Sequence, residues 1–129
     1  MPIRMFDTSV PGGRSAVSGV CLDSRTLSLR QLIRSRLQQE VERYNDAPPE
    51  IFQGLVQPEE SEQILNGSRM KTKRPLDWET QCRRAYISFE KNGFLVLLDG
   101  VQITDLDAPL RLREDSEVEF IKLVPLAGG

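Results

Sequence analysis

The chain has 129 residues, of which 39% are hydrophobic and 28% charged, with a formal net charge of -2. These values are typical of a single soluble domain with a hydrophobic core, and they give no reason to expect nucleic acid or a membrane as a partner. The sequence has no histidine, which excludes Ser-His and Cys-His catalytic pairs and the usual zinc sites. It also has no apolar run of about 18 residues and no signal-peptide pattern at its start. We therefore expect a cytoplasmic protein that is not an enzyme.

The two cysteines, Cys21 and Cys82, lie far apart in the sequence. Because a reducing compartment is expected, no disulfide between them is predicted. Cys21 lies among strand residues and Cys82 on an apolar helical face, so both are expected to be buried small hydrophobic residues rather than nucleophiles. No glycine-rich phosphate loop is present. The sequence thus predicts neither a bound cofactor nor a metal site.

Two antiparallel strands are predicted near the start of the chain. Residues 3–6 favour a short first strand. Pro11, Gly12 and Gly13, within residues 7–15, are typical of a turn or a hairpin tip. Residues 16–22, which include Val17 and Val20, favour the second strand.

A long amphipathic helix is predicted to begin at Ser28. Ser28 and Gln31 have the S-x-x-Q spacing of a capping box. Apolar residues then recur at steps of three and four, which places them on one face: Leu29, Leu32, Ile33, Leu37, Val41 and Tyr44. The charged residues expected mainly outside that face are Arg30, Arg34, Arg36, Glu40 and Arg43. A solvated surface is favoured there over a partner-binding one, and Asn45-Asp46 with the prolines that follow ends the helix.

Residues 46–76 have the composition of an insertion outside the core. Residues 58–65 fit one short helix with acidic residues in its first turn, and Asn66-Gly67 would stop it. A basic run follows, formed by Arg69, Lys71, Lys73 and Arg74. Such a run can attract an acidic partner or nucleic acid. Because no aromatic residues are interleaved with it, a solvated loop is the favoured interpretation.

A further helix is predicted over residues 77–92, with Asp77 as its N-cap and Asn92-Gly93 as its C-terminal stop. Its apolar stripe consists of Trp78, Cys82, Ala85, Tyr86 and Phe89. Such a stripe can form the wall of a ligand site, but packing in the core is favoured.

The last third of the chain favours strands. Residues 94–98 form an apolar run typical of a buried strand, and Asp99-Gly100 is a strong hairpin signal that returns the chain through 101–103. After a loop over 105–109, Leu110 and Leu112 are expected to pack inward. From Glu117 to Phe120, acidic and apolar residues alternate, which predicts a closing strand with one buried face, continuing through 121–124.

The order of these elements predicts an α+β domain in which a helix covers one face of a mixed sheet. The right-handed crossover rule places the closing strand beside the first strand and parallel to it.

The final five residues are Pro125, Leu126, Ala127, Gly128 and Gly129. Proline lacks a backbone donor, so the strand is expected to end before it and residues 125–129 to form a flexible tail. Glycines without side chains could enter a narrow enzyme channel, and the carboxylate could closely approach a nucleotide phosphate. We therefore interpret Gly128-Gly129 as a reactive end.

These features resemble the β-grasp family of ubiquitin and of the small sulfur carriers of thiamin and molybdopterin synthesis. Residues 94–103 are similar to that family's strand, tight turn and returning strand. Leu110 and residues 114–120 are similar to its entry into the final strand, and residues 125–129 resemble the ending of the carriers. The resemblance implies one β-grasp (ubiquitin-like) domain over residues 1–129, with a mixed sheet, one main crossing helix and an insertion at about 46–92.

That insertion has no counterpart in the simple carriers. It is more similar to bacterial ubiquitin-like proteins that are encoded beside activating-enzyme, conjugating-enzyme and JAB-type peptidase relatives, some of them in anti-phage defence.

The resemblance implies that the chain is the substrate of the chemistry rather than its catalyst. An E1-like activating enzyme would use ATP and Mg²⁺ to adenylate the Gly129 carboxylate. A ubiquitin-like modifier would then pass to an amine of a target protein, with an E2-like conjugating enzyme and a JAB-type peptidase as further partners. A sulfur carrier would instead acquire a thiocarboxylate at Gly129. A plain β-grasp interaction module, a third possibility, would use neither route.

The expected site is the tail and the residues that lead into it. Gly128 and Gly129 are the conjugation or activation site. The expected partner-binding residues are Leu123, Pro125, Leu126 and Ala127, because apolar residues that lead into an exposed tail have little core left to join. For Leu123, ordinary packing in the sheet is an equally good interpretation.

Overall fold

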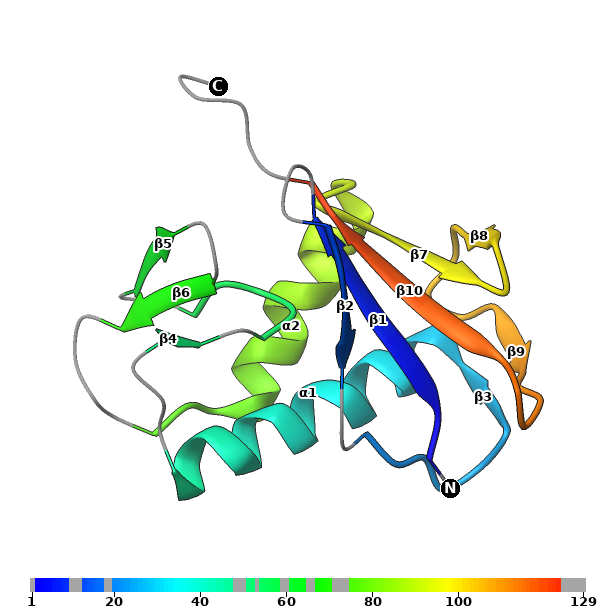
Figure 1. The fold of residues 1–129 in the computed structure, drawn as a ribbon, viewed down its shortest axis with the longest axis horizontal. Helices are drawn as coiled ribbons and strands as arrows, with labels where there is room; N and C mark the ends of the chain where they lie inside the picture. Colours follow the sequence, from blue (N-terminus) through cyan, green and yellow to red (C-terminus); the bar gives the residue numbers. More distant parts are fainter. Residues whose placement is uncertain are drawn as a thin grey trace.

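A mixed five-stranded sheet forms the centre of the fold (Figure 1). The computed structural model describes residues 2–9, 13–17, 20–47, 51–52, 54–58, 61–64, 67–70 and 75–123. The strands of this sheet are β1 (Arg4–Ser9), β2 (Gly13–Val17), β7 (Phe94–Leu98), β8 (Val101–Ile103) and β10 (Glu117–Lys122), in the order β2-β1-β10-β7-β8. β1 and β10 are parallel, as predicted, and the other pairs are antiparallel.

The helix α1 (Leu29–Asp46) packs its apolar face against this sheet (Figure 1). The capping box is confirmed, because Ser28 accepts from Gln31 N and the Gln31 side chain accepts from Ser28 N. All six apolar residues of the predicted face are buried. The sheet contributes Met5, Val96, Val118 and Phe120 to the same core, so the alternation predicted for the closing strand is also confirmed.

The helix α2 (Trp78–Glu90) follows its N-cap Asp77, whose side chain accepts from Thr80 N, as the sequence predicts. Cys82, Ala85 and Phe89 are buried in the common core, with Trp78 and Tyr86 packed partly buried against it. The predicted stripe is therefore core, and α2 lies against α1, where Tyr86 Oη donates to Arg30 O at 3.3 Å.

The segment between the two helices differs from the prediction. It contains β4 (Ile51–Phe52), β5 (Ser61–Ile64) and β6 (Gly67–Met70), which form a separate sheet in the order β4-β6-β5. The predicted short helix over 58–65 is wrong, because residues 61–64 pair with β6 as an antiparallel strand. Asn-Gly between two strands is a strong hairpin signal. Of the basic run, Arg69 lies exposed in β6, and residues 71–74 lie outside the described part of the chain.

The turns of the last third follow the sequence closely. Asp99 and Gly100 have φ values of 49° and 83°, the paired positive angles of a type I′ hairpin between β7 and β8. Leu110 and Leu112 are buried, and Leu110 lies in β9 (Pro109–Arg111), which pairs with β3 (Thr26–Ser28). The predicted loop over 105–109 thus ends one residue earlier.

Several predicted boundaries shift at the first hairpin. Residues 7–9 and 13–15, predicted as turn, belong to β1 and β2, because their ladder continues to the Ser9–Gly13 pair. Residues 10–12 and 18–19 lie outside the described ranges. Cys21 forms only an isolated bridge with Pro2 and is exposed, so its expected burial is wrong; Cys82 is buried. Neither described helix is long and apolar enough to cross a membrane.

Candidate functional site

Leu123 is the one predicted site residue that the structure describes. β10 ends at Lys122, and Leu123 is the first residue after the strand. The backbone N–H of Leu123 donates to Gly93 O at 3.2 Å. The Leu123 residue is 45% exposed, which makes it one of the three large hydrophobic residues that stand out on the described surface. Residues 124–129, which include Pro125, Leu126, Ala127, Gly128 and Gly129, lie outside the described ranges.

A row of apolar residues leads toward Leu123 on the outer face of the sheet. The register aligns Ile121 with Leu95 of β7 and with Thr8 of β1. Because neighbours along a strand point to opposite faces, Ile121 and Leu95 face away from the core residues Phe120 and Val96. Both are half-buried. Together with Leu123 they give the end of β10 an apolar contact surface.

The inner face of the same end contains a buried ion cluster of Asp7, Arg36, Glu40 and Lys122. Arg36 is fully buried, and its Nη1 and Nη2 donate to the two Asp7 oxygens at 2.6 Å each. Arg36 Nε donates to Glu40 at 2.6 Å, and Lys122 Nζ lies 3.3 Å from Asp7 Oδ2. The guanidinium also lies 4.6 Å from the Phe120 ring centroid. Two cations thus balance two carboxylates, as a buried cluster requires.

The protonation states follow from these contacts. Burial raises the pKa of Asp7, but hydrogen bonds and charge from Arg36, with a contribution from Lys122, outweigh it and hold that pKa below its ordinary value. Burial likewise lowers the pKa of Arg36, while Glu40 and Asp7 together raise it above its ordinary value. Asp7 and Arg36 are therefore both charged at neutral pH.

The cluster also fixes residues 54–58 beside the end of β10. Lys122 Nζ donates to Gly54 O at 3.0 Å, and Leu55 N donates to Glu40 at 3.2 Å. From α2, Arg84 donates to Gln57 O at 2.8 and 3.1 Å. Leu55 itself is 5% exposed and belongs to the common core. The segment that follows α1 is thereby attached to the strand that leads to the tail.

The sequence prediction that places Arg36 mainly outside the buried face is wrong. Arg36 is three residues after Ile33 and four after Leu32, a spacing that places all three on one face. Glu40, one turn later, supplies the opposite charge. This spacing was the available signal, but the partners on β1 and β10 are distant in sequence and could not be identified from it.

Among the residues that the structure describes, no group of three or more histidine, cysteine, aspartate or glutamate side chains could hold a metal ion. Comparison of the chain with protein-family models, with curated proteins and with solved structures finds no match.

Proposed function

We propose that this chain is a ubiquitin-like protein modifier of β-grasp fold, activated at the Gly129 carboxylate and joined to a target protein. The observation that carries the proposal is the path of the last strand. β10 lies in the centre of the sheet, parallel to β1, and it ends at Lys122, seven residues before Gly129 in the sequence. The strand order and the helix α1 on one face are compatible with a β-grasp-like fold.

The Gly129 carboxylate is a poor electrophile, so the proposed reaction must first activate it. In the proposed reaction, a Gly129 carboxylate oxygen attacks the α-phosphate of ATP, with Mg²⁺, on an E1-like enzyme, and pyrophosphate leaves. A thiolate of the activating enzyme then attacks the glycyl carbonyl and AMP leaves. The acyl group passes to an E2-like enzyme and finally to a lysine amine of the target, where the isopeptide forms and the thiol is released. A JAB-type peptidase is the proposed hydrolase of that bond.

The exposed residues at the end of β10 are the proposed recognition surface for these enzymes. Leu123 is half exposed, and Ile121 and Leu95 continue its apolar character on the outer face. Pro125, Leu126 and Ala127 extend the proposed surface along the tail. Gly128 and Gly129 supply the narrow segment that an adenylation channel could accept.

The second candidate function is sulfur transfer. The Pro-x-Ala-Gly-Gly ending favours it, because that ending resembles the small sulfur carriers. In this case the terminal sulfur of a donor protein's persulfide displaces AMP from the adenylate and forms an acyl disulfide. A second thiol of the donor then attacks the donor's own sulfur, a donor disulfide forms, and the thiocarboxylate at Gly129 is released. The chain would then donate sulfur and form no isopeptide bond.

Mass spectrometry of the protein from its native host separates these functions. The protein carries an affinity tag at its N-terminus, and a matched variant lacks Gly128 and Gly129. Lys122 is the last basic residue, so trypsin leaves Leu123–Gly129 as a remnant on each modified lysine. Remnant-bearing peptides that disappear in the truncated variant are the expected result.

Other results would contradict the modifier. A thiocarboxylate at Gly129 without any remnant assigns the chain to sulfur transfer. A native chain that continues past Gly129 and is never cut there, or an unmodified carboxylate even with the activating enzyme co-expressed, leaves only an interaction module of the same fold.

A further inference from the structure

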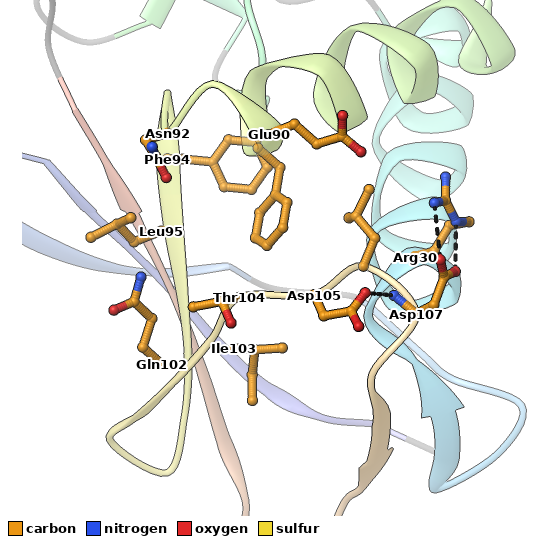
Figure 2. Close-up of a pocket in the computed structure, with 12 residues that line it drawn as sticks. Arg30, Glu90, Asn92, Phe94, Leu95, Gln102, Ile103, Thr104, Asp105 and Asp107 are labelled. Carbon is orange, nitrogen blue, oxygen red and sulfur yellow. Dashed lines mark hydrogen bonds and ion pairs between the residues drawn. The ribbon is translucent and has the colours of Figure 1, made fainter.

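A surface hollow of about 280 Å³ lies between the C-terminal end of α2, strands β7 and β8, and the loop over 104–107 (Figure 2). Its inner wall is apolar, because Phe89, Phe94 and Leu106 line it and are each less than 10% exposed. Small-molecule sites usually have volumes of about 300–1,000 Å³. The hollow is thus at the lower end of this size range, and an occupant no larger than a long side chain is the smallest that would use it.

The charges that line the hollow are unequal. Glu90, Asp105 and Asp107 provide three carboxylates, and Arg30 is the one cation among the lining residues. Arg30 is already held by Asp107, with Nε 3.0 Å from Asp107 Oδ1, and it lies over the Tyr86 ring at 4.9 Å. Hydrogen bonding and charge from Arg30 lower the pKa of Asp107. This pair is internally neutral, so the remaining charge of the hollow is negative.

Glu90 and Asp105 carry that remaining charge. They approach the hollow from different elements, Glu90 from α2 and Asp105 from the loop, and Figure 2 shows them on two sides of it. Within the described ranges, neither carboxylate forms an ion pair. Asp105 is nevertheless fixed, because its Oδ1 accepts from Asp107 N at 2.9 Å.

One edge of the hollow is the part of β7 that β8 does not pair with. β8 pairs only with residues 96–98 of β7. Among the described residues, no strand pairs with Phe94 or Leu95 on the β8 side of β7. On the other side, Phe94 pairs with Lys122, and Gly93 O accepts from Leu123 N. The hollow therefore lies one strand away from the end of β10.

We propose that this hollow receives a lysine or arginine side chain of a partner protein. These side chains have an apolar stem and a cationic head. The stem would lie on Phe89, Phe94 and Leu106, and the head would lie between Glu90 and Asp105, where charge-assisted hydrogen bonds are available. The inference rests on the shape and charge of the hollow and does not depend on the chemistry proposed for Gly129.

The probe for this site is a set of capped tripeptides, acetyl-Gly-X-Gly-amide, in which X is arginine, lysine, glutamine or glutamate. Backbone amide chemical shifts of the full chain are followed by NMR during each titration. The arginine and lysine peptides are expected to shift amides within 89–95 and 102–107 in a saturable way. The glutamine and glutamate peptides are expected to leave them unchanged.

Two conservative variants locate the binding. Glu90→Gln and Asp105→Asn keep the side-chain shape, and asparagine retains an oxygen that can accept from Asp107 N. Each is expected to weaken binding of the arginine peptide about tenfold, the loss of one charge-assisted contact. The matched control is Glu42→Gln, an exposed glutamate on α1 outside the hollow, which should bind as the parent chain does.

The proposal is overturned if the cationic peptides produce no saturable shifts, or if their shifts map away from the hollow. Equal binding of the glutamine peptide would show that charge does not select the occupant. Unchanged binding by Glu90→Gln and Asp105→Asn, with their spectra otherwise intact, would exclude these two carboxylates.

Discussion

Replacing Arg36 with methionine tests the electrostatic balance of the buried cluster. The substitution keeps much of the volume and removes the cation that binds Asp7 through two hydrogen bonds and Glu40 through one. Breaking a buried ion pair by removing one partner costs about 3–5 kcal/mol. Lys122 lies 3.3 Å from Asp7 and still offsets one carboxylate. The expected loss is thus near the lower end, about 3 kcal/mol, a large share of the about 5–15 kcal/mol that a domain has.

The measurement is urea unfolding followed by the fluorescence of Trp78, the only tryptophan in the chain. The matched control is Arg83→Met, an exposed arginine on α2, whose unfolding free energy should change by no more than about 0.5 kcal/mol. A third variant combines Arg36→Met with Asp7→Asn. It leaves Glu40 and Lys122 as one carboxylate and one cation, so its loss should be smaller than the sum of the single losses by at least about 1 kcal/mol.

Two outcomes would refute this reasoning. One is an unfolding midpoint for Arg36→Met equal to that of the Arg83→Met control. The other is additivity of Arg36→Met and Asp7→Asn within about 0.5 kcal/mol. If Arg36→Met does not fold, Arg36→Lys tests the geometry of the cluster separately, because it keeps the charge but loses the bidentate hydrogen bonds to Asp7; a loss of unfolding free energy no larger than that of the Arg83→Met control would then refute the role of those bonds.

Three further predictions concern the core, acid stability and the end of β10. Phe89→Ala should cost about 3–5 kcal/mol in urea unfolding because Phe89 is buried against Phe94, whereas Ile87→Ala on the same helix, at a residue 55% exposed, should cost under about 1 kcal/mol; equal losses would contradict the packing. The pKa of Asp7 is below its ordinary value of 3.8, so the unfolded chain takes up the proton first as the pH falls. Stability should then decrease from about pH 5 down through the folded pKa, and Asp7→Asn should show a smaller decrease in unfolding free energy; an equal decrease would exclude this carboxylate as a source. Leu123→Asp should leave the unfolding free energy within about 0.5 kcal/mol of the parent, yet should abolish remnant formation in the native host; normal remnant formation would remove Leu123 from the proposed recognition surface.

The sequence predicts best where the determining interactions are local. The capping box of α1, the N-cap of α2 and the Asp99-Gly100 hairpin each depend on residues within three or four positions, and each is confirmed. The parallel pairing of β1 with β10 is not local. It was nevertheless predictable, because the handedness of crossover connections leaves few arrangements for the closing strand.

The prediction of a helix over 58–65 is wrong because a local pattern competed with strand pairing. Acidic residues after Pro58 favour a helix N-terminus, but residues 61–64 satisfy their backbone groups by pairing with β6. Asn66-Gly67 supports either a helix stop or a hairpin, so the sequence alone does not distinguish the two.

The burial of Arg36 and the hollow beside α2 could not be predicted from the sequence, for a different reason. A charged residue in an amphipathic helix is usually solvated, but Arg36 is buried with two carboxylate partners, Glu40 from the same helix and Asp7 from β1. The hollow combines residues from α1, α2, β7, β8 and a loop. Such sites depend on the tertiary arrangement, which periodicity does not encode.

Residues 46–92, which the sequence predicts to be an insertion, include many contacts with the rest of the domain. Cys82, Ala85 and Phe89 complete the core that α1 and the sheet begin. Gly54 O accepts from Lys122 and Leu55 N donates to Glu40, so two residues of the buried ion cluster also hold the segment after α1. Removing 46–92 would therefore expose core side chains and leave Glu40 and Lys122 without these contacts. An enzyme that recognised Leu123, as proposed above, would meet a strand end that this stretch stabilises, so we do not expect deletion of 46–92 to leave a stable domain.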